Sequence, residues 1–378
     1  MTVATDTSSL IPVVDRAAAA ARSTTGVTRF GRACARAAAW QAGQLVDPPL
    51  GTPAWIDDAG LRRSPSPTDA FLADAPADWI DPPMLDADAA SRAARALDGA
   101  ELAGVLSVLV DDLGRWDDAI AIARAMVELE TWQQLDALPL LRAGSLLAID
   151  GDERCLDLFE HVATDADDPI DRTLGALRAA VALVKRLDGT RGHVRGALAR
   201  TLRCAHDVND RAARAVLRAL VHNLEALVEV RERNPRGARD LVRLAWSLIS
   251  GDETTSDELG PQFVAEVRTQ VLSNLAVVTG LLDGWVDAVP LFERGEQIAQ
   301  AGPSDALRME TGCLLGLARF HAGDLLGARN ALHRAEDAGL HIAMTRQRAQ
   351  VHKLLALVEH DLGNAERSQG WLERLHVA

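Results

Sequence analysis

The sequence predicts an all-α protein in which about seven helix pairs stack into a right-handed superhelix, an α-α solenoid. Two observations lead to this prediction. A leucine-rich run, a turn containing Gly, Asp or Asn, and a second helical run recur in the same order near the C-terminus. The small residues Ala288, Ala328 and Ser368, which lie near the start of each second run, are 40 residues apart. A fixed period of this size is typical of a stacked helical array.

The recurring small residue, called the anchor below, has a packing role. A small side chain at this position allows the second helix of a pair to approach the first closely. The large apolar residue four positions later lies on the same helix face and is expected to fill the space between pairs. In the three clearest copies this residue is Phe292, Leu332 or Leu372. Glycine suits the turn because it tolerates left-handed backbone dihedrals.

One copy matches a more specific repeat pattern. The matching residues are Leu315-Gly316, Gly323-Asp324, Ala328, Leu332 and Ala335. With these residues the chain resembles the tetratricopeptide repeat family, whose pattern includes L-G followed by A-x3-F. The copies here are 40 residues long, whereas repeats of that family have roughly 34, and leucine replaces most of its aromatic residues. The resemblance implies a binding fold whose first helices line a concave groove, and it specifies no ligand.

Composition excludes several classes of function. The chain of 378 residues carries 40 Lys and Arg against 54 Asp and Glu, and this net charge of −14 argues against nucleic acid or an anionic membrane as the main partner. The four cysteines are far apart, without a CxxC pair, as expected for a cytoplasmic protein without structural zinc. No apolar run approaches the roughly 18–20 residues that a membrane-spanning helix needs. We expect no cofactor and no metal.

The N-terminal part divides into two segments. Residues 1–46 are rich in Ala, Arg and Ser and predict a helical segment that packs on the array, with an organellar targeting segment as the alternative. Residues 47–85 contain eight of the 15 prolines and predict an irregular connection. Trp55, Phe71 and Trp79 favour a connection that lies on the array, because a free linker has little use for large aromatic residues.

Residues 86–378 are predicted to form the solenoid. A probable loop, Ser250 to Pro261, separates two of its pairs. The last helix contains Trp371 and Leu372 and is followed by no polar capping helix, so it is either one-sided or packs on a second copy or another partner. The anchors of the seven predicted pairs are Ala119, Cys155, His193, Ala238, Ala288, Ala328 and Ser368.

The first candidate site is basic. Between Arg172 and Arg218 there are eleven Lys or Arg residues against three Asp. Positions 15, 8 and 7 residues before an anchor are the expected groove positions. For the anchor His193 these are Arg178, Lys185 and Arg186, and Asn223 lies 15 residues before Ala238. Such residues can hold a carboxylate or a peptide C-terminus by charge-assisted hydrogen bonds. The alternatives are a solvated helix face, or an RNA or nucleotide site, which the lack of interleaved aromatic residues disfavours.

The second candidate is acidic. Asp111 and Asp112 begin a DDxxxxD motif, and Asp167 and Asp168 begin a DDxxD motif that ends at Asp171. On helices, such motifs can bind magnesium and a diphosphate. Both motifs here cross a turn, and helix capping is the competing interpretation, with Asp171 as the expected cap. We also expect Asp111 and Asp112 to lie at the acidic end of the groove.

No catalytic pattern accompanies these candidates. The histidines form no HExxH motif, and the sequence has no G-x-S-x-G, P-loop or GxGxxG before a strand. The predicted function is therefore a non-catalytic adaptor or regulatory scaffold that binds a protein or peptide with an acidic segment or C-terminal carboxylate. One alternative is a sensor or effector arm of a bacterial regulatory system that acts through a partner. Another is a magnesium-dependent enzyme of helical fold acting on a diphosphate. The expected contact residues are Arg178, Lys185, Arg186, Asn223, Asp111 and Asp112.

Overall fold

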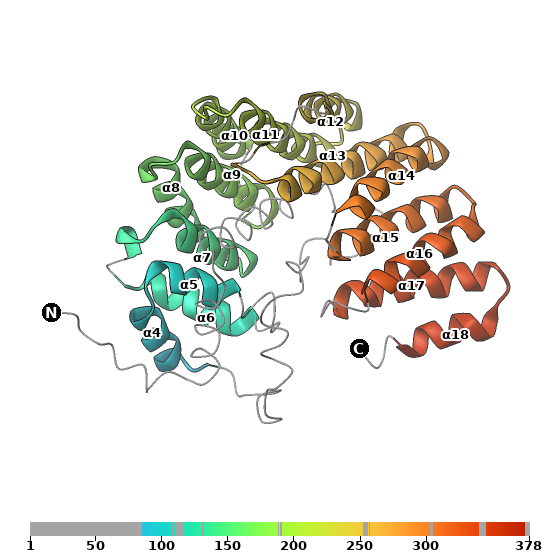
Figure 1. Cartoon of the computed structure of the whole chain (residues 1–378), viewed down its shortest axis with the longest axis horizontal. Helices are drawn as coiled ribbons and strands as arrows, with labels where there is room; N and C mark the ends of the chain where they lie inside the picture. The colour runs from blue at the N-terminus through green and yellow to red at the C-terminus, as the bar shows by residue number, and fades with distance from the viewer. Residues whose placement is uncertain are drawn as a thin grey trace. The chain divides into compact units, whose positions relative to one another are not determined.

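In a computed structural model, the described residues run from Leu85 to Arg374, with gaps at 108, 110–115, 130–131, 188, 190, 252–255, 257, 303–304 and 340–344. These residues form fifteen α-helices and one short 3-10 helix, with no strand among them (Figure 1). The all-α prediction is confirmed. The predicted segments 1–46 and 47–85 lie outside the described residues, except for Leu85.

The described chain divides into two compact units, of which the first ends at Asp207 and the second begins at Val208. The first unit contains α4 (Ala87–Ala96), α5 (Gly99–Ser107), α6 (Trp116–Val127), the 3-10 helix η5 (Trp132–Gln134), α7 (Ala137–Ile149), α8 (Cys155–Asp165), α9 (Pro169–Lys185) and α10 (Arg191–His206). From α5 onward each α-helix packs against the next, and α7 also contacts α9. Helix α4 begins directly after its N-cap Asp86, where the helical pattern of the sequence begins.

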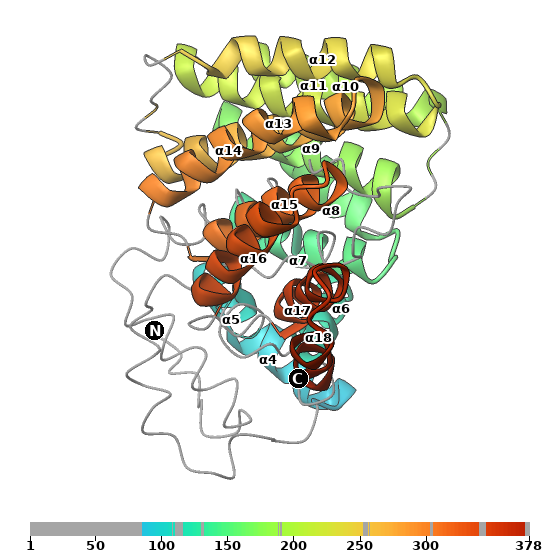
Figure 2. The same ribbon diagram turned by 90° about the vertical axis from the view of Figure 1, so that its right-hand side faces the viewer.

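The second unit contains α11 (Arg211–Arg231), α12 (Pro235–Ile249), α13 (Pro261–Leu282), α14 (Trp285–Ala301), α15 (Asp305–His321), α16 (Leu325–Gly339), α17 (Thr345–Asp361) and α18 (Ala365–Arg374). Each of these helices packs against the next along the chain (Figure 2). The odd-numbered helices α11, α13, α15 and α17, which are the first helices of the pairs, also contact one another in order. Helix pairs therefore follow one another in sequence order within this unit.

The turn inside a pair needs a left-handed residue. Gly151, Gly323 and Gly363 have φ of +76°, +81° and +78°. The residue after each glycine donates its backbone N–H to a carbonyl five residues earlier, as Asp324 does to Arg319 at 2.9 Å. This bond closes the last turn of the first helix and reverses the chain, so that the second helix returns along the first. The Gly-containing turn predicted from the sequence is confirmed at these positions.

In two turns, after Arg233 and after Gly363, the left-handed residue is followed by an asparagine whose side chain makes the same contact. The Asn234 side chain accepts a hydrogen bond from the Gly237 N–H at 3.1 Å, which caps α12, and its Nδ2 donates to Glu229 Oε2 at 2.7 Å. In the last pair, Asn364 Nδ2 donates to Glu359 Oε2 at 2.6 Å. The same amide–carboxylate contact therefore joins the end of the first helix to the start of the second in both pairs.

Arg233 is the exception among the left-handed residues, because it is the one described non-glycine residue with positive φ, at +60°. A side chain in this conformation costs about 1 kcal/mol. Since Arg233 is exposed, we expect Arg233→Gly to raise the free energy of unfolding of the second unit by up to about 1 kcal/mol. Urea unfolding followed by circular dichroism measures this change. Gly323→Ala is the reverse control and is expected to lower stability, whereas a less stable Arg233→Gly variant would contradict the strain argument.

The anchors pack as predicted in most pairs. Fully buried anchors, with 0% of their surface exposed, are Ala119, Cys155, Ala238, Ala288 and Ala328. Ser368 is half-buried and its hydroxyl donates to the Ala356 carbonyl at 2.8 Å. The prediction of His193 is wrong: His193 is exposed and Val194 is buried. The physical reason is that Val194 is apolar and His193 is polar, so burial of Val194 removes more apolar surface from water.

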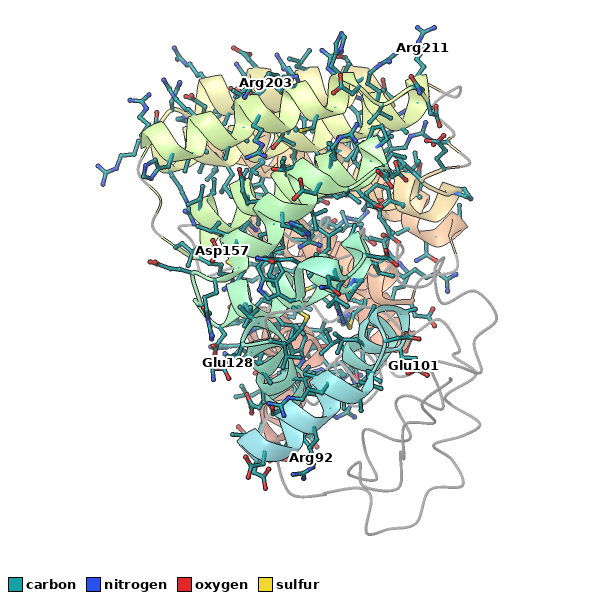
Figure 3. All side chains as sticks on the ribbon, turned by 90° about the vertical axis from the view of Figure 1, so that its left-hand side faces the viewer. Arg92, Glu101, Glu128, Asp157, Arg203 and Arg211 are labelled. Carbon is teal, nitrogen blue, oxygen red and sulfur yellow. The ribbon has the colours of Figure 1, made fainter. Side chains whose placement is uncertain are left out.

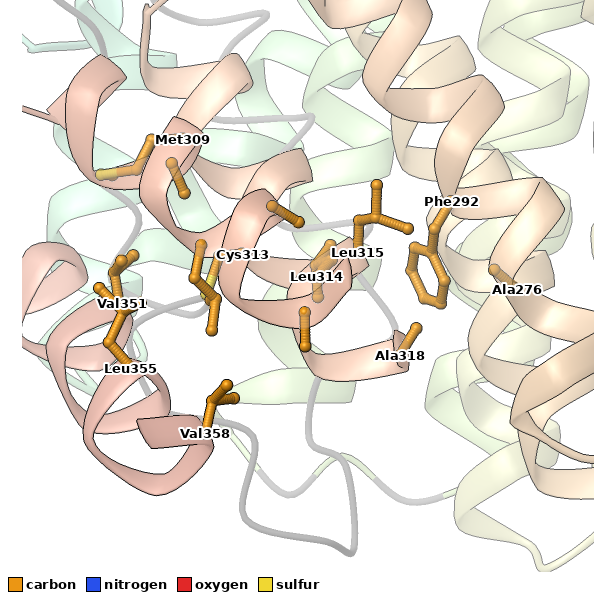
Figure 4. Packing of buried hydrophobic residues seen from close by; sticks show 14 of the residues in the cluster. Ala276, Phe292, Met309, Cys313, Leu314, Leu315, Ala318, Val351, Leu355 and Val358 are labelled. Carbon is orange, nitrogen blue, oxygen red and sulfur yellow. The ribbon is translucent and has the colours of Figure 1, made fainter. Parts of the chain in front are cut away.

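The apolar residues four positions after the anchors fill the space between pairs in two of the three clearest copies. Phe292 and Leu332 are buried in one cluster with Leu315 and Leu355. Figure 4 shows Phe292, Leu315 and Leu355 in this cluster. Leu372 is 40% exposed, so the prediction is wrong at this residue. No described helix packs on the outer side of α18, which has no buried residue. The side chain of Trp371 instead contacts the preceding helix, with its ring centroid 5.2 Å from that of His352.

Candidate functional site

The first helices of the pairs are more deeply buried than the second helices. Between their first and last turns, α9, α13 and α15 have no exposed residue among those described, whereas α10, α12, α14 and α16 each expose one face. A helix buried on all sides is expected to be apolar all round. Polar residues on these first helices therefore need a specific reason, because burying a polar group is costly unless it is hydrogen-bonded.

Helix α13 carries three such residues in one line. Glu266, Gln270 and Asn274 are four residues apart, so they lie on the same face of the helix, and all three are buried. Neighbouring first helices add buried Asn223 on α11 and buried Glu310 on α15. We call these five residues the polar column. The polar column combines amide groups, which donate and accept, with carboxylates, which accept hydrogen bonds and carry negative charge.

Asn223 belongs to the polar column through a direct hydrogen bond. Asn274 Nδ2 donates to Asn223 Oδ1 at 2.7 Å, and both side chains are buried. This bond joins α11 to α13 within the second unit. Asn223 thus has a structural role that the sequence did not indicate, and its predicted contact with a ligand remains a prediction.

Arg178 lies on α9 in the first unit and is only 5% exposed. A second arginine, Arg142 on α7, is 3% exposed. Burial, and after it the positive charge of Arg142, lower the pKa of Arg178 to about 9. The two guanidinium groups, called the arginine pair below, are therefore close enough to repel each other in a poorly solvated environment.

Lys185 and Arg186 lie at the C-terminal end of α9 and are half-buried. Lys185 is seven residues after Arg178, so the two point within about 20° of each other around the helix. Arg186 is the C-cap, with φ −125° and ψ −34°, and its N–H donates to the Ala182 carbonyl at 2.9 Å. Lys185 therefore shares the face of Arg178, and Arg186 does not. Asn223, predicted beside them, belongs to the other compact unit.

The acidic motifs differ in outcome. Asp111 and Asp112 lie outside the described residues. In the second motif the helix-cap interpretation is confirmed, but the predicted residue is wrong. The cap is Asp168, whose Oδ1 accepts a hydrogen bond from the Ile170 N–H at 2.8 Å, and Asp171 lies in the first turn of α9. Pro169 explains the difference, because proline is favoured at the first helical position, directly after the cap.

Nucleophilic and metal chemistry find little support in the part of the chain that the structure describes. Burial raises the pKa of the Cys155 and Cys313 thiols to about 12, so neither provides a reactive thiolate near neutral pH. Across the described ranges, no three His, Cys, Asp or Glu side chains are grouped so that they could hold a metal ion.

Asp118 is buried and has a structural role. Its Oδ1 accepts a hydrogen bond from the Leu85 N–H at 2.7 Å, which attaches the start of the described chain to α6.

Sequence reasoning missed Arg142, three residues of α13 and Glu310 of α15. The rule that selected positions 15, 8 and 7 before an anchor passes over Arg142, which precedes Cys155 by a different interval. It also passes over Glu266, Gln270 and Asn274. The spacing of four residues between Glu266, Gln270 and Asn274 is a signal that the sequence contains, and it indicates a polar line on one helix face.

The sequence matches no protein-family model, and no curated protein matches it either. Among the described helices, none has both the length and the apolar character needed to cross a membrane. The fold and the candidate residues therefore define a class only: an all-α protein of consecutively packed helices whose buried first helices carry polar and basic side chains.

Proposed function

We propose that this chain is a non-catalytic binding module, an adaptor or regulatory scaffold that holds a protein or peptide against the first helices of its pairs. In this proposal about seven tetratricopeptide-like pairs form the superhelix, and the protein acts in the cytoplasm. The observation that carries the proposal is the polar column. Its amide and carboxylate groups lie on the first helices, which line the groove in this proposal, and they suit recognition of a peptide backbone, which needs both donors and acceptors.

Charge extends the proposal to the chemistry of the partner. Arg178 and Lys185 share one face of α9 and are proposed to contact acidic groups of the partner, with Arg186 close by. Glu266 and Glu310 are carboxylates and are suited to accept hydrogen bonds from N–H groups or from a basic side chain. A partner with an acidic segment or C-terminal carboxylate fits the first set of residues.

A regulatory arm that acts through a partner is a variant of the same proposal, since it uses the same contact residues. The diphosphate enzyme is less well supported. Asp168, which its second motif would need as a metal ligand, accepts a backbone N–H as the cap of α9.

Peptide selection tests the proposed function. Peptides selected from a random library against the full-length chain are expected to bind with an affinity that depends on the polar column. The variant Glu266→Gln/Glu310→Gln preserves side-chain shape and removes both charges, so we expect at least a tenfold weaker Kd, which corresponds to about 1.4 kcal/mol. Fluorescence anisotropy with labelled peptides measures this change.

The matched control is Glu366→Gln, which makes the same chemical change at an exposed position on α18. It is expected to leave peptide binding unchanged. Circular dichroism melts of each variant show whether the fold is retained. Selected peptides that bind the double variant as tightly as the original chain would refute the role of the polar column.

A further inference from the structure

We propose that α17 and α18 form a dimer interface, at which a second copy of this chain packs on the exposed side of the last described helix pair. The interface consists of Lys353, Leu357 and Asp361 on α17 and Leu372 on α18, called the end face below. All four residues are exposed. The inference goes beyond the proposed function, because association of two copies needs no peptide ligand.

The first argument is the correspondence between the last two pairs. Helices α17 and α18 each begin 40 residues after their counterparts α15 and α16, so Lys353 corresponds to Cys313 and Leu372 to Leu332. Cys313 and Leu332 are only 2% and 0% exposed. They belong to the apolar cluster that joins their pair to α17, and Figure 4 shows Cys313 in it. In the preceding pair, the side equivalent to the end face therefore packs against a neighbouring helix.

The second argument is the apolar surface of the end face. Leu357 is 51% exposed and Leu372 is 40% exposed, and they come from two helices that pack against each other. Covering these side chains removes apolar surface from water, which favours association. A two-fold dimer uses the same face on both copies, so it covers four leucine side chains at one interface.

The third argument is the arrangement of charge, which favours a second copy over another partner. Lys353 lies four residues before Leu357 and Asp361 four residues after it, so all three share one face of α17. Within one copy, Lys353 and Asp361 are about 12 Å apart along the helix axis, too far to pair with each other. If two copies of α17 cross antiparallel about a two-fold axis at Leu357, their rows of residues at intervals of four align. Lys353 then meets Asp361 of the partner subunit, and the face is complementary to itself.

The first test is sedimentation equilibrium of the full-length chain. The end face comes from two helices only, so we expect a reversible dimer with a Kd on the order of 10 μM. Over concentrations from about a tenth of this Kd to about ten times this Kd, the average mass should rise from 40.5 kDa toward twice that value. Leu357→Gln is expected to weaken association about tenfold. The matched control is Leu326→Gln at an exposed position on α16, which should leave association unchanged.

Charge reversal tests the two-fold arrangement. Lys353→Glu places like charges at both Lys353–Asp361 contacts of the dimer, and so does Asp361→Lys, so each variant alone is expected to stay monomeric over the same concentrations. An equal mixture of the two variants should form a dimer again, because both contacts then join opposite charges. Pairing within one copy cannot produce this rescue. The control is Arg203→Glu, at an exposed position on α10 (Figure 3), which should associate like the unaltered chain.

Three results would overturn the dimer interface: a monomer at every concentration, association that Leu357→Gln does not weaken, or a mixture of the two reversed variants that stays monomeric. Circular dichroism of each variant shows whether its fold is retained. The Glu266→Gln/Glu310→Gln variant separates this inference from the proposed function, because its changes lie outside the end face and it should dimerise like the unaltered chain. If peptides bind through the polar column and no dimer forms, the interface fails and the proposed function stands.

Discussion

Gly175→Ala is expected to lower the free energy of unfolding of the first unit by about 3 kcal/mol. A Cβ atom at position 175 would lie 2.8 Å from the backbone nitrogen of Ala163 and 2.8 Å from the backbone oxygen of Phe159. Both atoms belong to α8, so the clash is with the backbone of that helix. A flexible side chain could move aside, but here α8 and α9 must separate, which loosens the packing around them.

Phe159 makes this separation costly. Its ring lies against Gly144 of α7, where an added Cβ would come within 2.6 Å of the ring. Helix α8 is therefore held closely by α7 on one side and by α9 on the other, with a glycine at each contact. Displacing α8 from α9 cannot be relieved by a shift toward α7.

The control for this prediction is Gly196→Ala, the same substitution on α10 in the same unit. Position 196 is exposed and a Cβ there would have no neighbouring atom within 4 Å. Because alanine favours the helix more than glycine does, this variant should gain about 0.5–1 kcal/mol. Urea unfolding of both variants measures the difference. Similar small changes in the two variants would show that α8 and α9 can separate without loss.

Glu336→Gln is expected to destabilise the last two helix pairs by about 3 kcal/mol, the second large effect. Glu336 on α16 is buried and accepts a hydrogen bond from Arg348 Nη2 at 2.9 Å. His352 Nε2 lies 2.9 Å from the other carboxylate oxygen. Both partners are on α17. Removing one member of a buried ionic group leaves the charges of the other members unpaired. The resulting loss of stability is typically larger than the net stabilisation that the intact group provides.

The same carboxylate predicts a pH dependence. Burial raises the pKa of Glu336, but the hydrogen bond from Arg348 and the nearby His352 side chain outweigh this effect, and the net pKa lies below its usual value. A carboxyl group whose pKa is lower in the folded state contributes stability above its unfolded pKa, about 4.3, and that stability is lost as the pH falls through the folded pKa. Hydrogen-exchange protection of α16 and α17 should therefore decrease below about pH 4.

The Glu336→Gln variant should show a weaker decrease in protection at low pH, because its amide does not titrate. The exposed Glu366→Gln variant on α18 should follow the unaltered chain at every pH. If Glu336→Gln and the unaltered chain lose protection in parallel, another group is responsible for the acid sensitivity of these helices.

Local features were predictable from residue types. Gly323 and Gly363 adopt the left-handed backbone conformation because glycine has no Cβ atom that would clash there. This preference belongs to the glycine itself, so it can be read from the sequence. The anchors Ala288 and Ala328 are buried because helix-pair packing needs a small side chain at that position. Arg233 shows the limit of the rule: the turn keeps the same conformation without glycine, because the surrounding pair determines it.

The candidate site was less predictable. Arg178 and Lys185 were found because they lie at regular intervals from an anchor. Arg142 was not found, since its relation to Arg178 depends on which faces of α7 and α9 meet. The pairing of Asn223 with Asn274 joins residues 51 positions apart, and no local pattern contains that information. The anchor His193 was predicted from the weak copy Leu187-Asp188-Gly189, and this copy did not determine the register to one residue.

The amino-acid sequence by itself determined the helical class, the order of the helix pairs in the second unit and the positions of their turns, because each depends on periodicity and on residues close together in the chain. The tertiary structure decided which polar groups are buried, as at the arginine pair and the polar column, and which apolar residues stay exposed, as at Leu372. The physical reason is that burial and electrostatic cost depend on the neighbours that a side chain meets after folding, and these come from helices distant in the sequence.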